Sequence, residues 1–450
     1  MKLNKLQYIC AILMCYTSTQ MFAQQYSGHN SSNLTSVEWT LDECINYALE
    51  HNADIAMGEL DVESGKIALN SARMARLPNL SASLGGNIYF GRSPSRDATY
   101  IDNSQISGSL EIATNIPVYQ GFKIKHETDK SKLDFEAATQ NLAQARKNIS
   151  LKITSLFLQV MYDKELVCIA QSQLELSSSQ LELYKGQYES GKISRNNVVR
   201  SESLVAADRA SLIQNENTYA LDLLVLKHAM NLPDSVSLLP IMNLCDIPII
   251  EEIPSLNQVF EQSVRLHPAI KYAEASLKSS EFALKSAKSS YHPTVFFSAG
   301  YNNSIYSNLT KRINTSFWNQ IKSNGNEYIG LSIYIPVFSR NTIKNNVRLS
   351  KLSVKRQEIL LFEAQKCLKK EIEQAYYEAI SAQSSLISAK KAFEASILNL
   401  ENEKVNLNLG HSNIYDYANA MAEVKKAQAF LAHSKYDLIL RIKILNFYMN

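Results

Sequence analysis

Apolar residues recur at helical spacing through a long central stretch of the chain. Between Phe122 and Tyr188 there is no proline and the only glycine is Gly186, so neither helix-breaking residue interrupts the stretch before its end. The apolar positions keep the helical period, for example Ile149, Ile153, Leu156, Phe157 and Val160. We therefore predict one continuous helix of roughly 70 residues, which is about 100 Å long at ~1.5 Å per residue.

The chain contains this long helical pattern twice. After the Ile-Pro-Val sequence at 335–337 no proline occurs, and Gly410 is the only glycine. At one fixed offset, the Ile-Pro-Val sequence at 116–118 corresponds to the one at 335–337, and Gly191 corresponds to Gly410. This self-similarity predicts a tandem duplication.

Each repeat also contains two shorter helical patterns. At the start of the first, Thr40 is followed three residues later by Glu43, which is the capping-box arrangement. Placed end to end, the two short helices of a repeat match the length of its long helix. We therefore predict that each repeat pairs one continuous rod with two half-length helices, the four short segments being 41–75, 197–230, 256–290 and 414–449.

Four other segments alternate between apolar and polar residues, which is the period of a β-strand. In the first, Leu80, Leu84 and Ile88 alternate with serine, glycine and asparagine. Polar loops join the segments in pairs, so each repeat contains one predicted antiparallel hairpin. The strands are expected at about 79–90, 105–117, 294–306 and 327–337.

The strand pattern admits two structural interpretations. Strands of roughly 10 to 12 residues with one apolar and one polar face are typical of outer-membrane barrels, in which the apolar face contacts lipid. A soluble hairpin that rests its apolar face on helices has the same pattern. Because the smallest barrels need about eight strands, four strands would enter a bilayer only if several chains shared one barrel.

The start of the chain and the segment between the repeats complete the predicted organisation. Lys2 and Lys5 precede an apolar run and Ala23, which is typical of a secretory signal peptide over 1–23. Processing as a lipoprotein at Cys15 is a second interpretation. The remaining segments are then a first repeat at 24–231, a proline-containing linker at 232–253 and a second repeat at 254–450.

Composition and motifs argue against several functions. The chain has 46 Lys and Arg and 43 Asp and Glu, and this near-neutral balance does not favour a nucleic-acid partner. HExxH, GxSxG and phosphate-binding glycine motifs are absent, so we predict no cofactor, no metal site and no catalytic residue, hence a protein that is not an enzyme. The cysteines beyond the signal show no metal-binding spacing and are either helix-packing residues or partners in a disulfide: Cys44, Cys168, Cys245 and Cys367.

Together these features resemble the TolC-type outer-membrane efflux proteins. The resemblance rests on the duplicated order of helix, hairpin, long helix and helix, on Leu-Pro at 77–78 and His-Pro at 292–293 before the hairpins, and on the Ile-Pro-Val sequences after them. Similar glycine-containing turns follow both long helices. The resemblance covers essentially the whole chain after the signal.

The resemblance implies a fold class and a set of partners. It implies a mainly α protein with a membrane β-barrel, in which a homotrimer closes one shared barrel of twelve strands on a helical tunnel. It also implies contact with outer-membrane lipid, a periplasmic adaptor protein and an inner-membrane pump. The protein would lie in the cell outer membrane and extend into the periplasm, and the segment 232–253 would join a belt around the tunnel.

The resemblance assigns the glycine turns to the periplasmic tip that the adaptor contacts. By position, the tip residues are Gly191 with Ser194 in the first repeat and Gly410 with Asn413 in the second. A second interpretation is that each glycine only caps its helix in a left-handed conformation. The two roles are compatible.

Acidic residues line the closed aperture of the tunnel in the resembling family. Asp416 occupies the first such position here, whereas Asn419 stands at the second. Three copies of Asp416 around a narrow axis would attract cations, although the neutral Asn419 would weaken that attraction. The alternative is that Asp416 is a solvated acid that the helix dipole favours near a helix N-terminus.

We predict a passive outer-membrane export duct that conducts substrates from the periplasm or a pump to the exterior and is gated at its periplasmic tip. The alternative is a secreted structural or adhesive coiled-coil protein without a pore. The strand alternation favours the duct, as does the lack of a long regular heptad pattern. Drug, metal and protein cargo are all compatible with these features.

Overall fold

The computed structural model describes residues 36–94, 96–97, 99–233, 235–242, 256–309 and 315–449. The described chain divides into a small unit, formed by residues up to Glu38 and by Pro233–Leu239, and a large unit that contains the rest. Strands β1 (Ser36–Trp39) and β6 (Ser237–Pro240), most of which belong to the small unit, pair with each other. The predicted signal peptide and residues 243–253 of the predicted linker lie outside the described residues.

Two long helices dominate the large unit, as the sequence predicted. Helices α4 (Lys123–Glu189) and α9 (Thr342–Asn408) have 67 residues each and run without a break. Each begins after two consecutive left-handed residues, which lie at the same positions of the two repeats: Gly121 and Phe122, then Arg340 and Asn341. The duplication therefore extends to unusual backbone conformations and not only to helix length.

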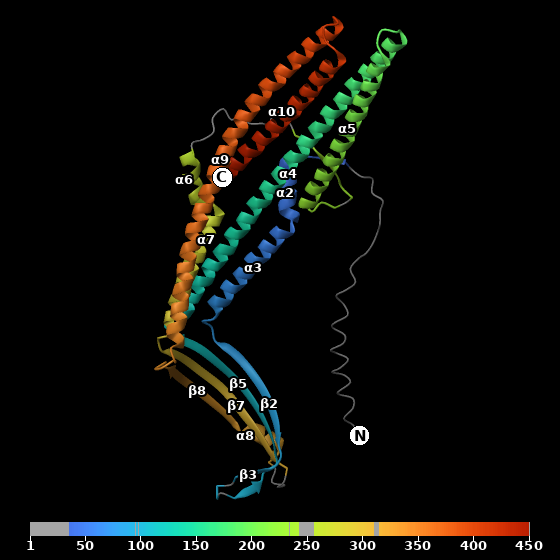
Figure 1. The fold of residues 1–450 in the computed structure, drawn as a ribbon. Coiled ribbons are helices and arrows are strands. Elements are labelled where there is room, and N and C mark those ends of the chain that lie inside the picture. The colour runs from blue at the N-terminus through green and yellow to red at the C-terminus, as the bar shows by residue number, and fades with distance from the viewer. Residues whose placement is uncertain are drawn as a thin grey trace, which may run out of the picture. The chain divides into compact units, whose positions relative to one another are not determined.

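Each long helix packs against shorter helices along its two halves (Figure 1). Helix α4 contacts α2 (Leu41–His51) and α3 (Ala53–Met74) along its first part and α5 (Arg195–Ala229) along its second. Helix α9 contacts α6 (Leu256–Leu266) and α7 (Pro268–Ser289), and then α10 (Ile414–Met449). The predicted arrangement of one long helix and two half-length partners is confirmed. Fully buried side chains of α4, such as Ile153, Phe157 and Val160, pack in these contacts.

The prediction that the first short helix of each repeat is continuous was wrong. Asn52 separates α2 from α3, and its side chain accepts a hydrogen bond from the Asp54 backbone N–H at 2.8 Å. In the second repeat Pro268 starts α7, because its ring cannot continue a helix and it holds His267 in an extended conformation. The His-Pro pair was the sequence signal for this break.

The breaks lie where the two half-length helices of a repeat meet. In the first repeat the Asn52 side chain donates to the Ala229 carbonyl at the end of α5, at 3.4 Å. In the second, Ser263 Oγ donates to the Tyr448 carbonyl near the end of α10 at 2.5 Å. A polar side chain at or near each break thus bonds a carbonyl at a helix end that would otherwise lack a partner.

The capping box predicted before α2 is confirmed. Thr40 Oγ1 accepts from the Glu43 backbone N–H, and Glu43 Oε2 accepts from the Thr40 backbone N–H at 2.8 Å. Hydrogen bonds from Thr40 lower the pKa of Glu43. Of the helices in the described residues, none combines the length and the apolar character that a membrane-spanning helix requires.

The other end of the large unit is a four-stranded antiparallel sheet in the order β2-β5-β7-β8. Strands β2 (Asn79–Tyr89) and β5 (Gln105–Tyr119) form the hairpin of the first repeat, and β7 (Thr294–Asn308) and β8 (Gly325–Tyr334) form that of the second. The hairpins join through β5 and β7, which pair over most of their length. Strands β2 and β8 are consequently the two edges.

A proline lies at or near the end of two strands, β5 and β8, and affects how each of them ends. Strand β8 ends at Tyr334, earlier than expected, because Pro336 has no N–H to donate to a ladder. Strand β5 continues past Pro117 to Tyr119, but its register against β7 shifts between these residues. Irregularity at Pro117 thus marks the passage from sheet to helix in the first repeat.

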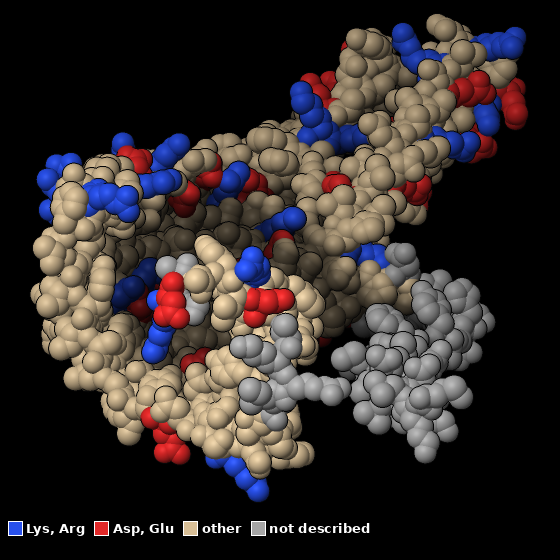
Figure 2. Space-filling view, turned by 90° about the horizontal axis from the view of Figure 1, so that it is seen from below, with Lys and Arg blue, Asp and Glu red and all other residues tan. Residues whose placement is uncertain are grey.

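The loops that the sequence assigned no structure contain two small elements. Strands β3 (Arg92–Pro94) and β4 (Tyr100–Asp102) pair within the first loop, and helix α8 (Phe317–Ser323) lies in the second. Figure 2 views the strand end and shows a curved, largely uncharged band around a hollow, whereas basic and acidic side chains are interspersed along the helices that extend beyond it.

Candidate functional site

The predicted tip consists of the two turns that follow α4 and α9. Gly191 and Gly410 both have a left-handed backbone, with φ of 74° and 75°. In the first turn the Lys192 N–H donates to the Gln187 carbonyl at 2.8 Å, and in the second the His411 N–H donates to the Asn406 carbonyl at 2.9 Å. These bonds are those of a Schellman helix end, so each glycine has the predicted capping role.

The other two predicted tip residues, Ser194 and Asn413, precede α5 and α10 and differ in their bonding. Asn413 Oδ1 accepts from the backbone N–H groups of Tyr415 at 2.8 Å and of Asp416 at 3.1 Å. Ser194 makes no side-chain hydrogen bond to the start of α5. A side chain, that of Asn413, therefore caps the helix that follows the second turn, whereas the helix after the first turn has no such cap.

Asp416 and Asn419, the predicted aperture residues, are both exposed on α10. Asp416 lies in the first turn of the helix, where the dipole stabilises a carboxylate. Asn419 lies one turn further along and lines a groove. Asp416 and Asn419 are thus one helical turn apart on α10, and of the two only Asn419 lines the groove.

This groove lies between α4, α5 and α10 and has a volume of about 340 Å³. Two buried tyrosines line it, Tyr184 from α4 and Tyr417 from α10, and their burial raises the pKa of both phenols. Further lining comes from small and aliphatic residues such as Ser201, Leu204 and Met421. The groove therefore lies between α4 and α5 of the first repeat on one side and α10 of the second repeat on the other.

Two charged contacts cross between the repeats on this side of the molecule. The Arg200 guanidinium of α5 lies over the Tyr415 ring of α10, 5.5 Å from the ring centroid. Further along, Lys425 Nζ of α10 lies 3.2 Å from both Asp208 Oδ1 and Ser211 Oγ of α5. These contacts tie α10 to α5.

Sequence reasoning did not find these contacts. Nothing in the sequence pairs Arg200 with Tyr415, because the two residues lie in different repeats. Lys425 and Asp208 also lie in different repeats, 217 residues apart, and no local spacing in the sequence indicates that they pair. Only the packing of one repeat on the other brings them together.

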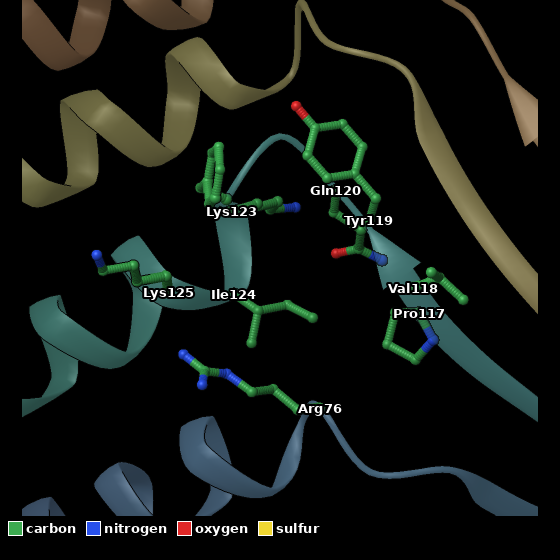
Figure 3. A pocket seen from close by; sticks show the side chains of 9 residues that line it. Arg76, Pro117, Val118, Tyr119, Gln120, Lys123, Ile124 and Lys125 are labelled. Atoms are coloured by element: carbon green, nitrogen blue, oxygen red, sulfur yellow. The ribbon is translucent and has the colours of Figure 1, made fainter.

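A second cavity, of about 440 Å³, lies at the junction of sheet and helices. Figure 3 shows Arg76, just after α3, on one side of the cavity, Lys123 and Lys125 from the start of α4 on another, and Pro117, Val118 and Tyr119 at the end of β5 on a third. Lys123 pairs with Glu127 at 3.7 Å. The described residues that line the cavity are basic, aromatic or aliphatic apart from Gln120, and they include no carboxylate, thiol or imidazole.

Metal and thiol chemistry have little support in the described part of the chain. No group of three His, Cys, Asp or Glu residues there is arranged to hold a metal ion. Cys44, Cys168 and Cys367 are free, and burial raises the pKa of the Cys44 thiol to about 12. Cys44 is thus an inert packing residue, whereas Cys245 lies outside the described residues.

Comparison with known families accounts for both repeats. The family model described as outer membrane efflux protein matches residues 44–232 and 259–443, which together make up most of the chain. The chain belongs to this family. It is therefore an outer-membrane protein of export systems, with the fold of TolC-like channels, and the alternative prediction of a secreted coiled-coil protein has no support.

Individual members of the family are similar at low sequence identity. The toxin and drug export protein A of Aggregatibacter actinomycetemcomitans is 20% identical over 439 residues, which is 95% of this chain and 90% of that protein. Among solved structures, VceC of Vibrio cholerae has a TM-score of 0.76 at 15% identity, over 91% of this chain and 96% of its own. The CmeC channel of Campylobacter jejuni has a TM-score of 0.77 at 15% identity, over 95% and 90%.

The unequal capping of the two turns gives a testable difference. Replacing Asn413 with alanine removes two hydrogen bonds to the start of α10, and the loss of such a cap costs about 1 kcal/mol. We expect the amides of Tyr415 and Asp416 to exchange with deuterium about fivefold faster in Asn413→Ala. The matched variant Ser194→Ala removes no such bond and should leave exchange at the start of α5 unchanged. Equal acceleration in both variants would contradict the assignment.

Proposed function

We propose that three copies of this outer membrane efflux protein close one barrel and form a passive duct from the periplasm to the exterior. The observation that carries the proposal is the four-stranded sheet with two unpaired edges, β2 and β8. In a bilayer every backbone N–H and C=O needs a partner, so an open edge is not tolerated. Pairing β8 of one copy with β2 of the next satisfies both edges.

Barrel size supports three copies. Two copies would give eight strands, and the interior of such a barrel is just wide enough to be filled by side chains. Three copies give twelve strands and are the smallest number expected to leave an open lumen. The polar face of the sheet, with residues such as Ser83, Ser109 and Ser298, would line that lumen, and the apolar face would contact lipid.

The helices would then extend from the barrel into the periplasm, with the glycine turns at their far ends. We assign Gly191 with Ser194 and Gly410 with Asn413 to the surface that a periplasmic adaptor contacts, and the adaptor would connect the duct to an inner-membrane pump. Both glycine Cα atoms have open space around them, since a Cβ built on either would meet no atom within 4 Å. A partner could therefore approach the backbone closely there.

In this proposal the duct itself does no chemistry and hydrolyses nothing. The energy for transport comes from the pump, and the choice of cargo lies largely with the pump as well. Gating would consist of moving α10 away from α5 at the tip, because the contacts of Arg200 and Lys425 hold these two helices together.

The native mass of the protein in detergent tests the duct. We expect a trimer that requires detergent for solubility and fractionates with outer membranes, because the apolar face of the sheet needs lipid and the sheet edges need partners. A monomer or dimer that is soluble without detergent would rule the duct out.

The contacts between α5 and α10 predict a gating phenotype. Arg200→Ala with Lys425→Ala removes a cation–π contact and an ion pair, which together contribute about 1–2 kcal/mol. We expect a larger single-channel conductance in planar lipid bilayers, because α10 is less firmly held. Lys185→Ala is the control, since the ion pair that it breaks is with Glu182 on the same helix. Conductance equal to that of the control would show that these contacts do not restrain the gate.

Asp416 predicts a second electrical property. If three copies face the axis, Asp416→Asn removes a ring of carboxylates that attracts cations. We expect the trimer to assemble normally while its conductance changes and its block by divalent cations weakens. Asp61→Asn, an exposed acid on α3, is the matched control. Channel behaviour like that of the control would place Asp416 away from the aperture.

A further inference from the structure

Helix α8 replaces a missing piece of strand at the outer end of the sheet. Strand β8 begins at Gly325 opposite Asn303, so β7 extends beyond the end of its partner. There the buried Gln320 side chain of α8 accepts from the Tyr306 N–H at 2.7 Å and donates to the Tyr306 carbonyl at 2.8 Å. One side chain thus makes the pair of bonds that an adjacent strand would make.

The strand register places α8 on the apolar face of the sheet. Asn303 stands opposite Leu110, and Leu110 stands opposite Leu84, so the three side chains share one face. Leu84 is 85% exposed, whereas Asn303 is only 4% exposed. Asn303 Nδ2 donates to the Ile321 carbonyl of α8 at 2.7 Å, so α8 covers the polar residue that interrupts this face.

Two aromatic residues of α8 remain exposed. Phe317 is 54% and Trp318 68% exposed, and their rings meet edge to face with centroids 5.5 Å apart. They add to the apolar surface of this face beyond the end of β8. Lys322 in the last turn of α8 adds a positive charge beside them.

The position of α8 along the strand matches a membrane boundary. Tyr306 stands eleven positions after Val295, which lies at the other end of β7, and eleven steps of ~3.3 Å are about 36 Å of strand. At a tilt of about 40° this corresponds to roughly 28 Å of height, compared with an apolar band of about 25 Å in outer-membrane barrels. Helix α8 therefore lies near the outer limit of that band.

We propose that α8 is an interfacial anchor that places Phe317 and Trp318 among the outer-leaflet lipids, at the boundary between acyl chains and headgroups. Tryptophan suits this boundary because its ring is apolar and its N–H is polar. The anchor rests on the proposed function, because it requires the sheet to enter the bilayer as part of a barrel. Gln320 docks the helix, and Lys322 faces the negatively charged groups of the lipid surface.

The chain contains only two tryptophans, Trp39 and Trp318, so fluorescence can test the anchor directly. The full chain carrying Trp39→Phe is reconstituted into phosphatidylcholine vesicles with bromine atoms either near the headgroup or near the chain ends. We expect Trp318 emission to be quenched by both lipids and more strongly by bromine near the headgroup. The Trp318→Phe protein, in which Trp39 alone emits, should show no quenching by either lipid.

Flotation of the same vesicles separates the possible failures. Protein that does not float with the vesicles would overturn the proposed duct and the anchor with it. Protein that floats while Trp318 is unaffected by bromine would overturn the anchor alone. Aqueous iodide would then distinguish a water-exposed Trp318, which it quenches, from one covered by a neighbouring copy, which it does not.

A second variant tests the docking of α8. Gln320→Ala on the Trp39→Phe background removes both bonds to Tyr306 but leaves the aromatic residues in place. We expect less quenching by headgroup bromine and a weaker dependence on bromine depth, because the helix no longer has a fixed position. Asn319→Ala, an exposed neighbour on the same helix, is the control and should behave like the parent. An identical depth profile for Gln320→Ala and its parent would show that Gln320 does not position the anchor.

Discussion

The pairing of backbone groups at the edges of the sheet is the constraint on which the rest of this structure depends. A four-stranded sheet with an apolar face cannot remain alone in a bilayer, because β2 and β8 each leave a row of backbone groups without partners. The chain satisfies part of this requirement itself. Where β8 stops, Gln320 bonds the Tyr306 backbone and Asn324 Nδ2 donates to the Ser304 carbonyl at 2.6 Å. The backbone groups that remain unpaired are those along the outer edges of β2 and β8, where a second copy can pair with them.

Duplication explains why the helical part is so regular. The two long helices have the same length, and the short helices of the two repeats match almost residue for residue, at 11, 22 and 35 residues against 11, 22 and 36. In each repeat the long helix packs on the three shorter helices of its own repeat, and α4 also packs on α7 and α10 of the other repeat. The apolar residues buried between the helices then supply most of the stability, because helices in proteins are stabilised mainly by tertiary packing.

Periodicity and helix breakers made much of this fold predictable from the sequence. The long helices followed from the absence of proline, the strands from alternation, and the cap of α2 from Thr40 and Glu43. The elements that were missed depend on contacts between distant segments. The break at Asn52 is secured by the end of α5, and α8 is held by Asn303 and Gln320 against β7, which no local pattern reveals.

The same distinction applies to the candidate site. The glycine turns were found because a left-handed helix end needs glycine, and a local signal suffices for that. The contact of Arg200 with Tyr415 joins residues from different repeats, so the sequence contains no spacing that could indicate it. Asp416 was found by resemblance alone, and its geometry in one chain is that of an exposed residue in the first turn of a helix.

The contacts that α10 makes with α5 near the tip differ from those at its other end, and this difference indicates where a movement could begin. Near the tip α10 is held to α5 by the Arg200–Tyr415 contact, which contributes about 0.5–1 kcal/mol when exposed. Towards its other end Lys435 pairs with Glu165 and Arg441 with Glu378, and Leu445 is buried in an apolar cluster with α6, α7 and α9. A buried leucine alone contributes about 1.5–3 kcal/mol. In the proposed duct the tip of α10 would therefore separate first, while its base stays fixed and acts as the hinge.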